Sequence, residues 1–180
     1  MPALVRPAMA YMASFVEAMR EGYSRDTLRP ETPETIAAVA DQPAWFLSQL
    51  LNPPITVVLP DGSVGPRVPE TVLWYVEGEE FLGSVSVRHS LTPMLELWGG
   101  HIGYAVRPSA WGRGYASAML AGMLDHVRAN LPLERVTLTA NTQNLASIRV
   151  IEKNGGVLGD TIPHPWVEGD EGRRYWIDLR

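Results

Sequence analysis

The sequence contains no cysteine. This absence excludes disulfide bonds, thiolate metal ligands and a cysteine nucleophile, and it fits a reducing compartment. No apolar run reaches the ~18 residues that a membrane-spanning helix needs, and residues 1–15 lack the basic-then-apolar layout of a secretion signal. We therefore expect a cytoplasmic protein that uses no membrane as a partner.

Positive charge is also scarce. The chain has 15 lysines and arginines against 20 acidic residues, a formal net charge of −5, and no basic run. General nucleic-acid binders need a basic face to displace counterions from phosphates, so we expect no nucleic-acid partner. The four histidines lie at scattered positions without the spacing of metal ligands, so the sequence predicts no metal site.

The residues that are present fit one domain over 1–180, because 46% apolar residues in 180 can fill a single core. Apolar residues at three- and four-residue intervals predict a helix over 7–21. A second helical region starts at Thr32-Pro33, a capping hydroxyl followed by a first-turn proline, and Pro43 divides it before it ends at 51.

The rest of the chain contains both predicted strands and predicted helices. The segments ITVVL, TVLWYV, FLGSVSVRH and LELWGGHIGYAV are rich in β-branched and aromatic residues and predict successive antiparallel strands. A helical stripe runs from Ala116 to Val127, followed by a strand in ERVTLTA, a helix over 144–153 and a closing strand in RRYWIDL. The sequence therefore predicts an α/β (α+β) fold, with a mixed sheet of six or seven strands and helices on both faces.

A glycine turn lies inside a strand–turn–helix–strand unit, residues 96–140. Its sequence is VRPSAWGRGYASAML, from Val106 to Leu120. Gly112 and Gly114 let the backbone come close to a ligand at a helix N-terminus, where free N–H groups favour an anion. A dinucleotide fingerprint would need a third glycine at Ser117, and the Gly-Lys-Ser/Thr of a P-loop occurs nowhere, so neither pattern explains the turn.

Two blocks in this order resemble the GNAT N-acetyltransferase superfamily: HIGYAVRPSAWGRGYASAML and TLTANTQNLASIRVIEKNGGVLGD. The superfamily's pyrophosphate loop reads Arg/Gln-x-x-Gly-x-Gly/Ala, and residues 111–116 carry it with tryptophan at the first position. That tryptophan is similar to the branch of ribosomal-protein amino-terminal acetyltransferases, and the first block also resembles a subgroup of predicted acetyltransferases without an assigned substrate. The resemblance implies a GNAT-like, mostly antiparallel sheet with a splay between two central parallel strands, residues 101–106 and 135–140.

The resemblance also divides the chain by role. Residues 96–156 would form the acetyl-CoA-binding core, and residues 7–51 would form one wall of the acceptor site. A homodimer is compatible with the superfamily, although no residue indicates one. The implied coenzyme-binding residues are Ala105, Val106, Trp111, Gly112, Arg113, Gly114, Tyr115, Ala116, Asn144 and Ser147.

Each of these residues has an implied task. Backbone N–H groups over 111–116 would hold the coenzyme A pyrophosphate, with a charged contact from Arg113. Pantetheine would lie in the splay along residues 103–106, where an N–H near Ala105 or Val106 would stabilise the developing oxyanion. Asn144 and Ser147 would face the coenzyme from the next helix; the alternatives are a helix cap for the first and a packing residue for the second.

The acid and the base are less clearly marked. Relatives supply the acid from a tyrosine whose position here is Ile151. His101 is the first candidate for the base, Tyr104 a candidate acid and Glu96 a further candidate on the same predicted strand, with His89 and water behind them. His101 and Tyr104 would face opposite sides of a regular strand, so both enter one pocket only through a bulge. A structural role for His101 is the alternative.

The leading function is an acetyl-CoA-dependent N-acetyltransferase that acetylates a primary amine, on a small molecule or a peptide amino terminus, by direct attack in a ternary complex. Acetyl-CoA would be the cosubstrate. A non-catalytic acyl-CoA sensor or scaffold is the alternative, because Ile151 replaces the usual acid. A nucleotide-binding α/β enzyme of another class is a third reading, which the two failed phosphate patterns disfavour.

Overall fold

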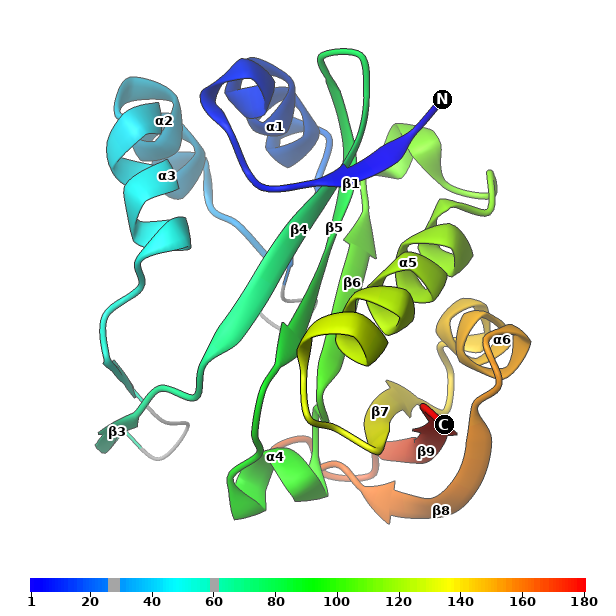
Figure 1. The fold of residues 1–180 in the computed structure, drawn as a ribbon. Coiled ribbons are helices and arrows are strands. Elements are labelled where there is room, and N and C mark those ends of the chain that lie inside the picture. Colours follow the sequence, from blue (N-terminus) through cyan, green and yellow to red (C-terminus); the bar gives the residue numbers. More distant parts are fainter. Residues whose placement is uncertain (26–29, 59–61) are drawn as a thin grey trace.

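The computed structural model describes residues 1–25, 30–58 and 62–180 (Figure 1). Seven strands form two antiparallel sheets, and a small hairpin stands apart from them. The first sheet has the order β1 (Ala3–Val5), β4 (Glu70–Glu77), β5 (Glu80–Arg88), β6 (Ile102–Val106), and the second has the order β7 (Arg135–Asn141), β9 (Glu171–Asp178), β8 (Val157–Pro163). The hairpin pairs β2 (Thr56–Val58) with β3 (Val64–Pro66).

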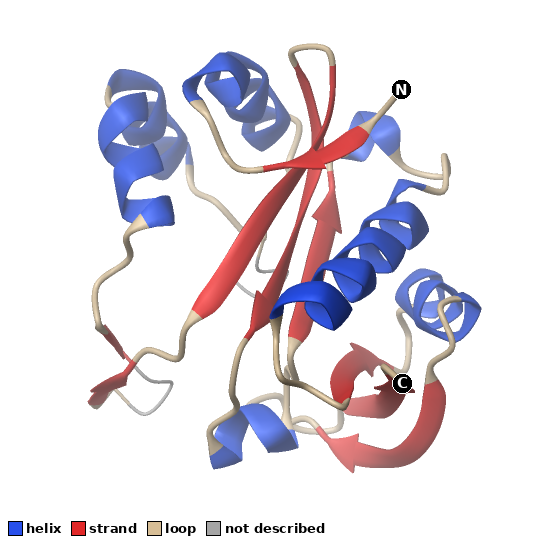
Figure 2. Cartoon of the chain, in the orientation of Figure 1, coloured by secondary structure: helices blue, strands red, loops and turns tan. Residues whose placement is uncertain are grey.

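Helices lie on both sides of the first sheet (Figures 1 and 2). They are η1 (Met9–Tyr11), α1 (Met12–Arg20), α2 (Pro33–Asp41) and α3 (Pro43–Leu51) on one side, and α5 (Tyr115–Asn130) and α6 (Leu145–Lys153) on the other. Two short helices, α4 (Pro93–Leu97) and η2 (Pro108–Ala110), lie in the connections before and after β6. The predicted α/β class, with six or seven strands and helices on both faces, is confirmed.

Local signals explain where these helices begin. The Thr32 hydroxyl accepts a hydrogen bond from the Thr35 N–H at 3.2 Å, and Pro33 occupies the first helical position of α2. Pro43 starts α3 directly after α2 ends, because a proline cannot continue the hydrogen-bond pattern of the helix before it. The predicted division of this helical region at Pro43 is therefore confirmed.

The two faces of the first sheet carry separate cores. On one face α1 packs an aromatic cluster against the sheet, in which the ring centroids of Phe15 and Trp74 lie 4.9 Å apart and Phe81 meets both rings edge-on. On the other face α5 and α6 pack on apolar residues of both sheets, among them Val85 of β5 and Leu138 of β7. This second core joins the two sheets through side chains.

The strand predicted for LELWGGHIGYAV is wrong in its first half. Residues 93–97 form α4, whose N-cap Thr92 accepts a hydrogen bond from the Leu95 N–H at 3.3 Å, and Pro93 follows it. This is the same Thr-Pro signal that starts α2. Gly99 and Gly100, with φ of +101° and +68°, then turn the chain into β6. Glu96 consequently lies on α4 and does not share a strand with His101.

The predicted splay is present between β6 and β7. The two strands meet at a single isolated bridge, Gly100–Leu138, and beside it the His101 N–H donates to the Thr137 carbonyl at 2.7 Å. Both strands lie wholly within the described residues, and no ladder joins them: β6 pairs with β5, and β7 pairs with β9. A gap therefore opens toward the carboxyl end of β6.

Candidate active site

A cavity of about 710 Å³ lies at this gap. Its walls come from the end of β6, the loop before α5, the first turns of α5 and α6, and the segment that follows α1. The lining residues are Gly22, Tyr23, Ser24, Pro30, Tyr104, Ala105, Val106, Ala110, Trp111, Gly112, Gly114, Tyr115, Ala116, Ser117, Asn144, Ala146, Ser147 and Val150. Every predicted coenzyme-binding residue except Arg113 is among them, so the structure brings the two sequence blocks to one cavity.

The glycine loop presents backbone donors to this cavity. Gly112 and Gly114 have φ of +74° and +80°, and Gly114 is the N-cap of α5 without a capping side chain. The first helical hydrogen bond runs from the Ala118 N–H to the Gly114 carbonyl, so the N–H groups of residues 115–117 have no acceptor within the helix. A Cβ built on either glycine meets nothing within 4 Å, so the backbone conformation, and not a neighbouring protein atom, requires glycine here.

Trp111 joins this loop to the strand before it. Its indole Nε1–H donates to the Val106 carbonyl at 2.8 Å, while 67% of the residue stays exposed and the ring lines the cavity. A tryptophan at the first position of the motif can therefore anchor the glycine loop to the end of β6. Arg113 lies outside the lining, with its guanidinium carbon 5.6 Å from the centroid of the Tyr115 ring.

The ladder between β5 and β6 decides which backbone groups face the gap. The Arg107 N–H donates to Leu82 O and the Arg88 N–H donates to His101 O, and the register between these pairs has no shift. In an antiparallel pair, hydrogen-bonded and non-bonded positions alternate, so Ala105 bonds toward β5 while the N–H groups of residues 104 and 106 point toward β7. Of the two predicted oxyanion donors, the geometry favours Val106 over Ala105.

The first turn of α6 forms the opposite wall. The Asn144 side-chain oxygen accepts a hydrogen bond from the Ser147 N–H at 3.0 Å, which makes Asn144 the N-cap of the helix as well as a cavity residue. The Ser147 carbonyl in turn accepts a hydrogen bond from the Tyr104 hydroxyl at 3.2 Å. The cap and the tyrosine together fix the width of the gap between β6 and α6.

The three predicted catalytic residues occupy different places. Tyr104 lines the cavity, and its burial raises the pKa of the phenol to about 12, so the hydroxyl stays protonated at neutral pH. His101 lies at the closed end of the splay and Glu96 lies on α4; neither is among the lining residues. The β5–β6 register has no shift, so the bulge that would bring His101 and Tyr104 into one pocket is missing.

The surroundings of His101 are those of a structural histidine. Its Nδ1 accepts a hydrogen bond from the Thr137 N–H at 3.1 Å, which places the proton of the neutral ring on Nε2. Burial, with a smaller contribution from Arg88, lowers the pKa of the imidazole below its usual value. The lone pair that a general base needs is therefore already engaged with the backbone of β7.

Ile151, at the position where relatives carry the tyrosine acid, is also placed away from the cavity. Its side chain is only 1% exposed and packs in the core beneath α5, where a Cβ at Gly156 would lie 2.4 Å from its Cγ2 atom. This position faces the core in the present chain. Ile151 is not among the residues that line the cavity.

Sequence reasoning missed the wall that follows α1. Tyr23 is 3% exposed, packs edge-on against Phe15 and Phe81, and shares a 2.6 Å hydrogen bond with the Ser84 hydroxyl. Ser84 pairs with Ala105 in the β5–β6 register, so the Tyr23 hydroxyl lies over the strand that lines the cavity. Burial raises the pKa of Tyr23 to about 12. In the sequence, the one signal for this contact is Ser84, a polar residue at a buried position of a strand.

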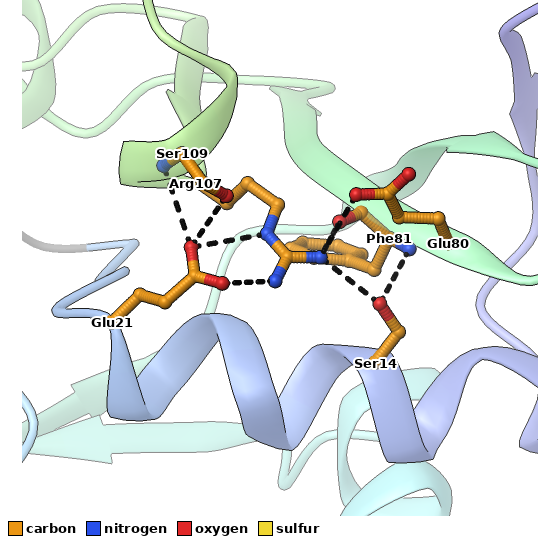
Figure 3. Close-up of polar contacts among 6 residues, drawn as sticks. All are labelled: Ser14, Glu21, Glu80, Phe81, Arg107 and Ser109. Atoms are coloured by element: carbon orange, nitrogen blue, oxygen red, sulfur yellow. Dashed lines mark hydrogen bonds and ion pairs between the residues drawn. The ribbon is translucent and has the colours of Figure 1, made fainter.

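Arg107 is the second residue that sequence reasoning missed. It follows β6 directly, is 5% exposed, and forms hydrogen bonds with Glu21, Ser14 and the Phe81 carbonyl (Figure 3). These contacts lower the pKa of the Glu21 carboxyl to about 2, chiefly through the hydrogen bond to Arg107. The pair is separated by 86 positions in the sequence, and no local pattern connects them.

Among residues 1–25, 30–58 and 62–180 no helix is long and apolar enough to cross a membrane. In the same ranges no group of three or more histidine and acidic side chains is placed to hold a metal ion.

Comparison with known proteins agrees with this geometry. The family model described as the Acetyltransferase (GNAT) domain matches residues 25–157. No curated protein matches the chain in sequence.

Solved structures share the fold at low identity. The ribosomal L7/L12 alpha-N-protein acetyltransferase RimL, in complex with coenzyme A, has a TM-score of 0.63 and 16% identity, with 99% of this chain and 96% of that chain covered. The spermidine/spermine N-acetyltransferase SpeG from Vibrio cholerae has a TM-score of 0.63 and 12% identity, covering 99% and 95%. The microcin C7 self-immunity acetyltransferase MccE, with acetyl-CoA and AMP, has a TM-score of 0.64 and 10% identity, covering 98% and 92%.

Proposed function

The chain belongs to the GNAT acetyltransferase family, and from that premise we propose that it transfers an acetyl group from acetyl-CoA to a primary amine by direct attack in a ternary complex. The observation that carries the proposal is the cavity itself. Backbone donors meet there from two sides: the N-terminus of α5 and the edge of β6 that faces the gap.

The residues present fit acetyl-CoA. The N–H groups of residues 115–117 suit a pyrophosphate, because they lack helical acceptors and lie at the positive end of the α5 dipole. The open space above Gly112 and Gly114 leaves room for phosphate oxygens near the backbone. At the edge of β6, the N–H groups of Tyr104 and Val106 and the Tyr104 carbonyl face the gap, where an extended pantetheine arm can bond to them; the Val106 carbonyl already accepts from Trp111.

Acetyl-CoA supplies a thioester whose carbonyl carbon accepts the amine's electron pair and whose C–S bond breaks as the N–C bond forms. The Val106 N–H would donate to the carbonyl oxygen as negative charge develops there, and one such donor is worth about 3 to 4 kcal/mol. The Tyr104 hydroxyl, kept protonated by burial, donates to the Ser147 carbonyl and would exchange this acceptor for the departing thiolate. Because burial raises the pKa of this phenol to about 12, it would stabilise the thiolate by a hydrogen bond without giving up its proton, and the thiolate would take its proton from water.

The amine must lose a proton before it attacks, since its reference pKa is about 10.4. Among the described residues that line the cavity none is an imidazole or a carboxylate. We therefore assign the proton to water at the open side of the cavity, and we keep His101 and Glu96 outside the transfer step. Orientation and the oxyanion contact then carry most of the rate.

The lining also bears on the acceptor. Segment 22–24 and Pro30 belong to the proposed acceptor-side wall, residues 7–51, and the remaining lining residues belong to the proposed coenzyme core, residues 96–156. None of these described residues carries a charge, so no lining residue within the described ranges pairs with the second and third ammonium groups of a polyamine. We propose a monoamine or a peptide amino terminus as the acceptor.

The second candidate function is a non-catalytic acyl-CoA sensor, which the buried Ile151 favours. One experiment separates the two. Calorimetry with acetyl-CoA tests binding, and release of free thiol in the presence of a simple alkylamine, an acidic and a neutral peptide, or spermidine tests transfer. Binding with thiol release that depends on the monoamine or peptide supports the proposed enzyme. Binding without amine-dependent release supports the sensor, and absence of binding refutes both.

A further inference from the structure

One charge network, centred on the buried Arg107, joins the two walls of the cavity. The Arg107 guanidinium bonds through Nε and Nη2 to the two carboxylate oxygens of Glu21, and Nη1 reaches the Ser14 hydroxyl at 3.1 Å and the Phe81 carbonyl at 3.0 Å (Figure 3). A weaker contact of 3.4 Å links Nη1 to Glu80. We call the set of Arg107, Glu21 and Ser109 the clamp.

Ser109 extends the clamp into the loop before α5. Its hydroxyl donates to a Glu21 carboxylate oxygen at 2.6 Å, and its N–H lies 3.4 Å from the same oxygen. A single carboxylate thus holds both the end of β6 and the short helix that leads to the glycine loop. Arg107 and Ser109 lie 86 and 88 positions away from Glu21 in the sequence.

The clamp residues border the cavity on both sides. Arg107 follows Val106, whose N–H faces the gap, and Glu21 precedes Gly22 and Tyr23, which line the cavity. The wall segment is also held by the hydrogen bond between Tyr23 and Ser84 on β5 and by the packing of the Tyr23 ring on Phe15 and Phe81. The clamp adds to these contacts an ionic link from Glu21 to the residue that follows β6.

Stability alone is a weak reason for such a network. Taking an arginine and a carboxylate out of water costs several kcal/mol, and apolar residues of similar volume often stabilise a fold equally well. What an ion pair adds is a fixed geometry, because the planar guanidinium fork donates to a carboxylate in one orientation. At this place the fixed geometry is the separation of the two cavity walls.

We propose that Arg107 and Glu21 are positioning residues: their clamp sets the acceptor-side wall, residues 22–24, against the end of β6. The proposal rests on the proposed acetyl transfer. It predicts that losing the clamp harms use of the amine much more than binding of the coenzyme. Glu21 reaches the loop before α5 through Ser109, whereas the N–H donors of residues 115–117 are held by α5, which packs into the second core through Met119 and Leu120.

The test uses Glu21→Gln, which keeps size and removes the charge, beside Arg107→Lys, which keeps the charge and removes the fork. We expect kcat/KM for the amine to fall at least tenfold in both, chiefly through KM, while the Kd for acetyl-CoA changes less than threefold. Ser109→Ala removes only the contact to the loop and should give a smaller effect in the same direction. The control is Asp160→Asn, which breaks another two-contact arginine pair, to Arg174, on the second sheet.

A readout that needs no turnover accompanies the kinetics. In the wild-type protein the N–H groups of Gly22 and Tyr23 donate to Met19 O and Ala18 O. Hydrogen exchange over residues 18–24 should speed up at least tenfold in Glu21→Gln and stay unchanged in Asp160→Asn, while exchange over 115–125 stays unchanged in both. Should Arg107→Lys fail to fold, Glu21→Gln and Ser109→Ala carry the test.

Two results would overturn the proposal: an unchanged KM for the amine in a folded Glu21→Gln protein, or a uniform rise in exchange across the chain, which marks a purely structural pair. If the wild-type protein binds acetyl-CoA and acetylates no amine, the proposed function fails, and the local exchange result still decides whether the clamp holds the wall.

Discussion

Replacing Gly100 by alanine should open the closed end of the splay. Gly100 has φ of +68°, and a Cβ built there would lie 2.3 Å from the Thr137 carbonyl oxygen and 2.8 Å from its carbon. Both atoms belong to the backbone of β7, so no flexible side chain can move aside. Relief requires β6 and β7 to separate at their isolated bridge.

The loss in the free energy of unfolding of Gly100→Ala is the sum of two contributions. The left-handed conformation costs a non-glycine residue about 1 to 2 kcal/mol. Separation of the strands weakens the two hydrogen bonds between His101 and Thr137, each worth about 1 kcal/mol. Together these predict that Gly100→Ala lowers the free energy of unfolding by about 3 to 4 kcal/mol, or about 6 to 16 °C in Tm for a chain of this size.

Gly155→Ala is the matched control. Gly155 also has a positive φ, +88°, but a Cβ added to it would meet nothing within 4 Å, so only the backbone strain of about 1 to 2 kcal/mol applies. Urea denaturation followed by tryptophan fluorescence measures both variants. Equal losses in the two proteins would refute the reasoning, because they would show that contact with Thr137 adds nothing to backbone strain.

Four more predictions concern the site. Gly114→Val should weaken coenzyme A binding at least tenfold, about 1.4 kcal/mol, because valine disfavours φ of +80°; calorimetry on the folded variant checks this. The Glu21 carboxyl has its pKa lowered from 4.5 to about 2, so its stabilisation is complete above pH 4.5 and is lost as the pH falls toward 2. The full shift would be about 3 kcal/mol; because the side chain is about a third exposed we expect about 1 to 2, and urea denaturation against pH should show a shallower acid limb in Glu21→Gln. His101→Ala should leave the pH profile of amine acetylation unchanged and lower the unfolding free energy by about 1 to 2 kcal/mol; loss of a limb near its pKa would restore His101 as the base. Tyr104→Phe should reduce kcat up to about tenfold without changing the Kd for acetyl-CoA, and thiol-release kinetics that show no change would remove its hydroxyl from the transfer step.

Local chemistry made the coenzyme side of the site predictable. The glycines at 112 and 114, the helix stripe after them and the Asn-capped α6 are each encoded within a few residues, and the structure places them as the sequence indicates. The splay was predicted from the resemblance to GNAT proteins, since no residue of β6 or β7 alone reveals that two strands will fail to pair.

The wrong strand prediction came from a local signal that was misread, and the missed site residues depend on contacts that are distant in the sequence. Thr92-Pro93 is a helix-start signal, yet the aromatic and β-branched residues after it favoured a strand over the whole segment. Tyr23 reaches the site through Ser84, 61 positions away, and Arg107 reaches Glu21 across 86. A buried polar group finds its partner only when the fold is complete, so such pairs carry no sequence pattern.

The way in which the two sheets are joined has a consequence for the protein's response to ligand. Between β6 and β7 the backbone contributes one bridge, the two His101–Thr137 hydrogen bonds lie beside it at the closed end, and apolar packing under α5 supplies most of the remaining cohesion. Apolar contacts have no preferred direction, so the two sheets can shift slightly relative to each other at small cost, and this cohesion weakens on cooling. A ligand that bonds to the free edge of β6 would supply the directional contacts that the junction lacks. Saturation at about 100 times its Kd would add about 2.7 kcal/mol to the free energy of unfolding and make the two halves melt as one cooperative unit.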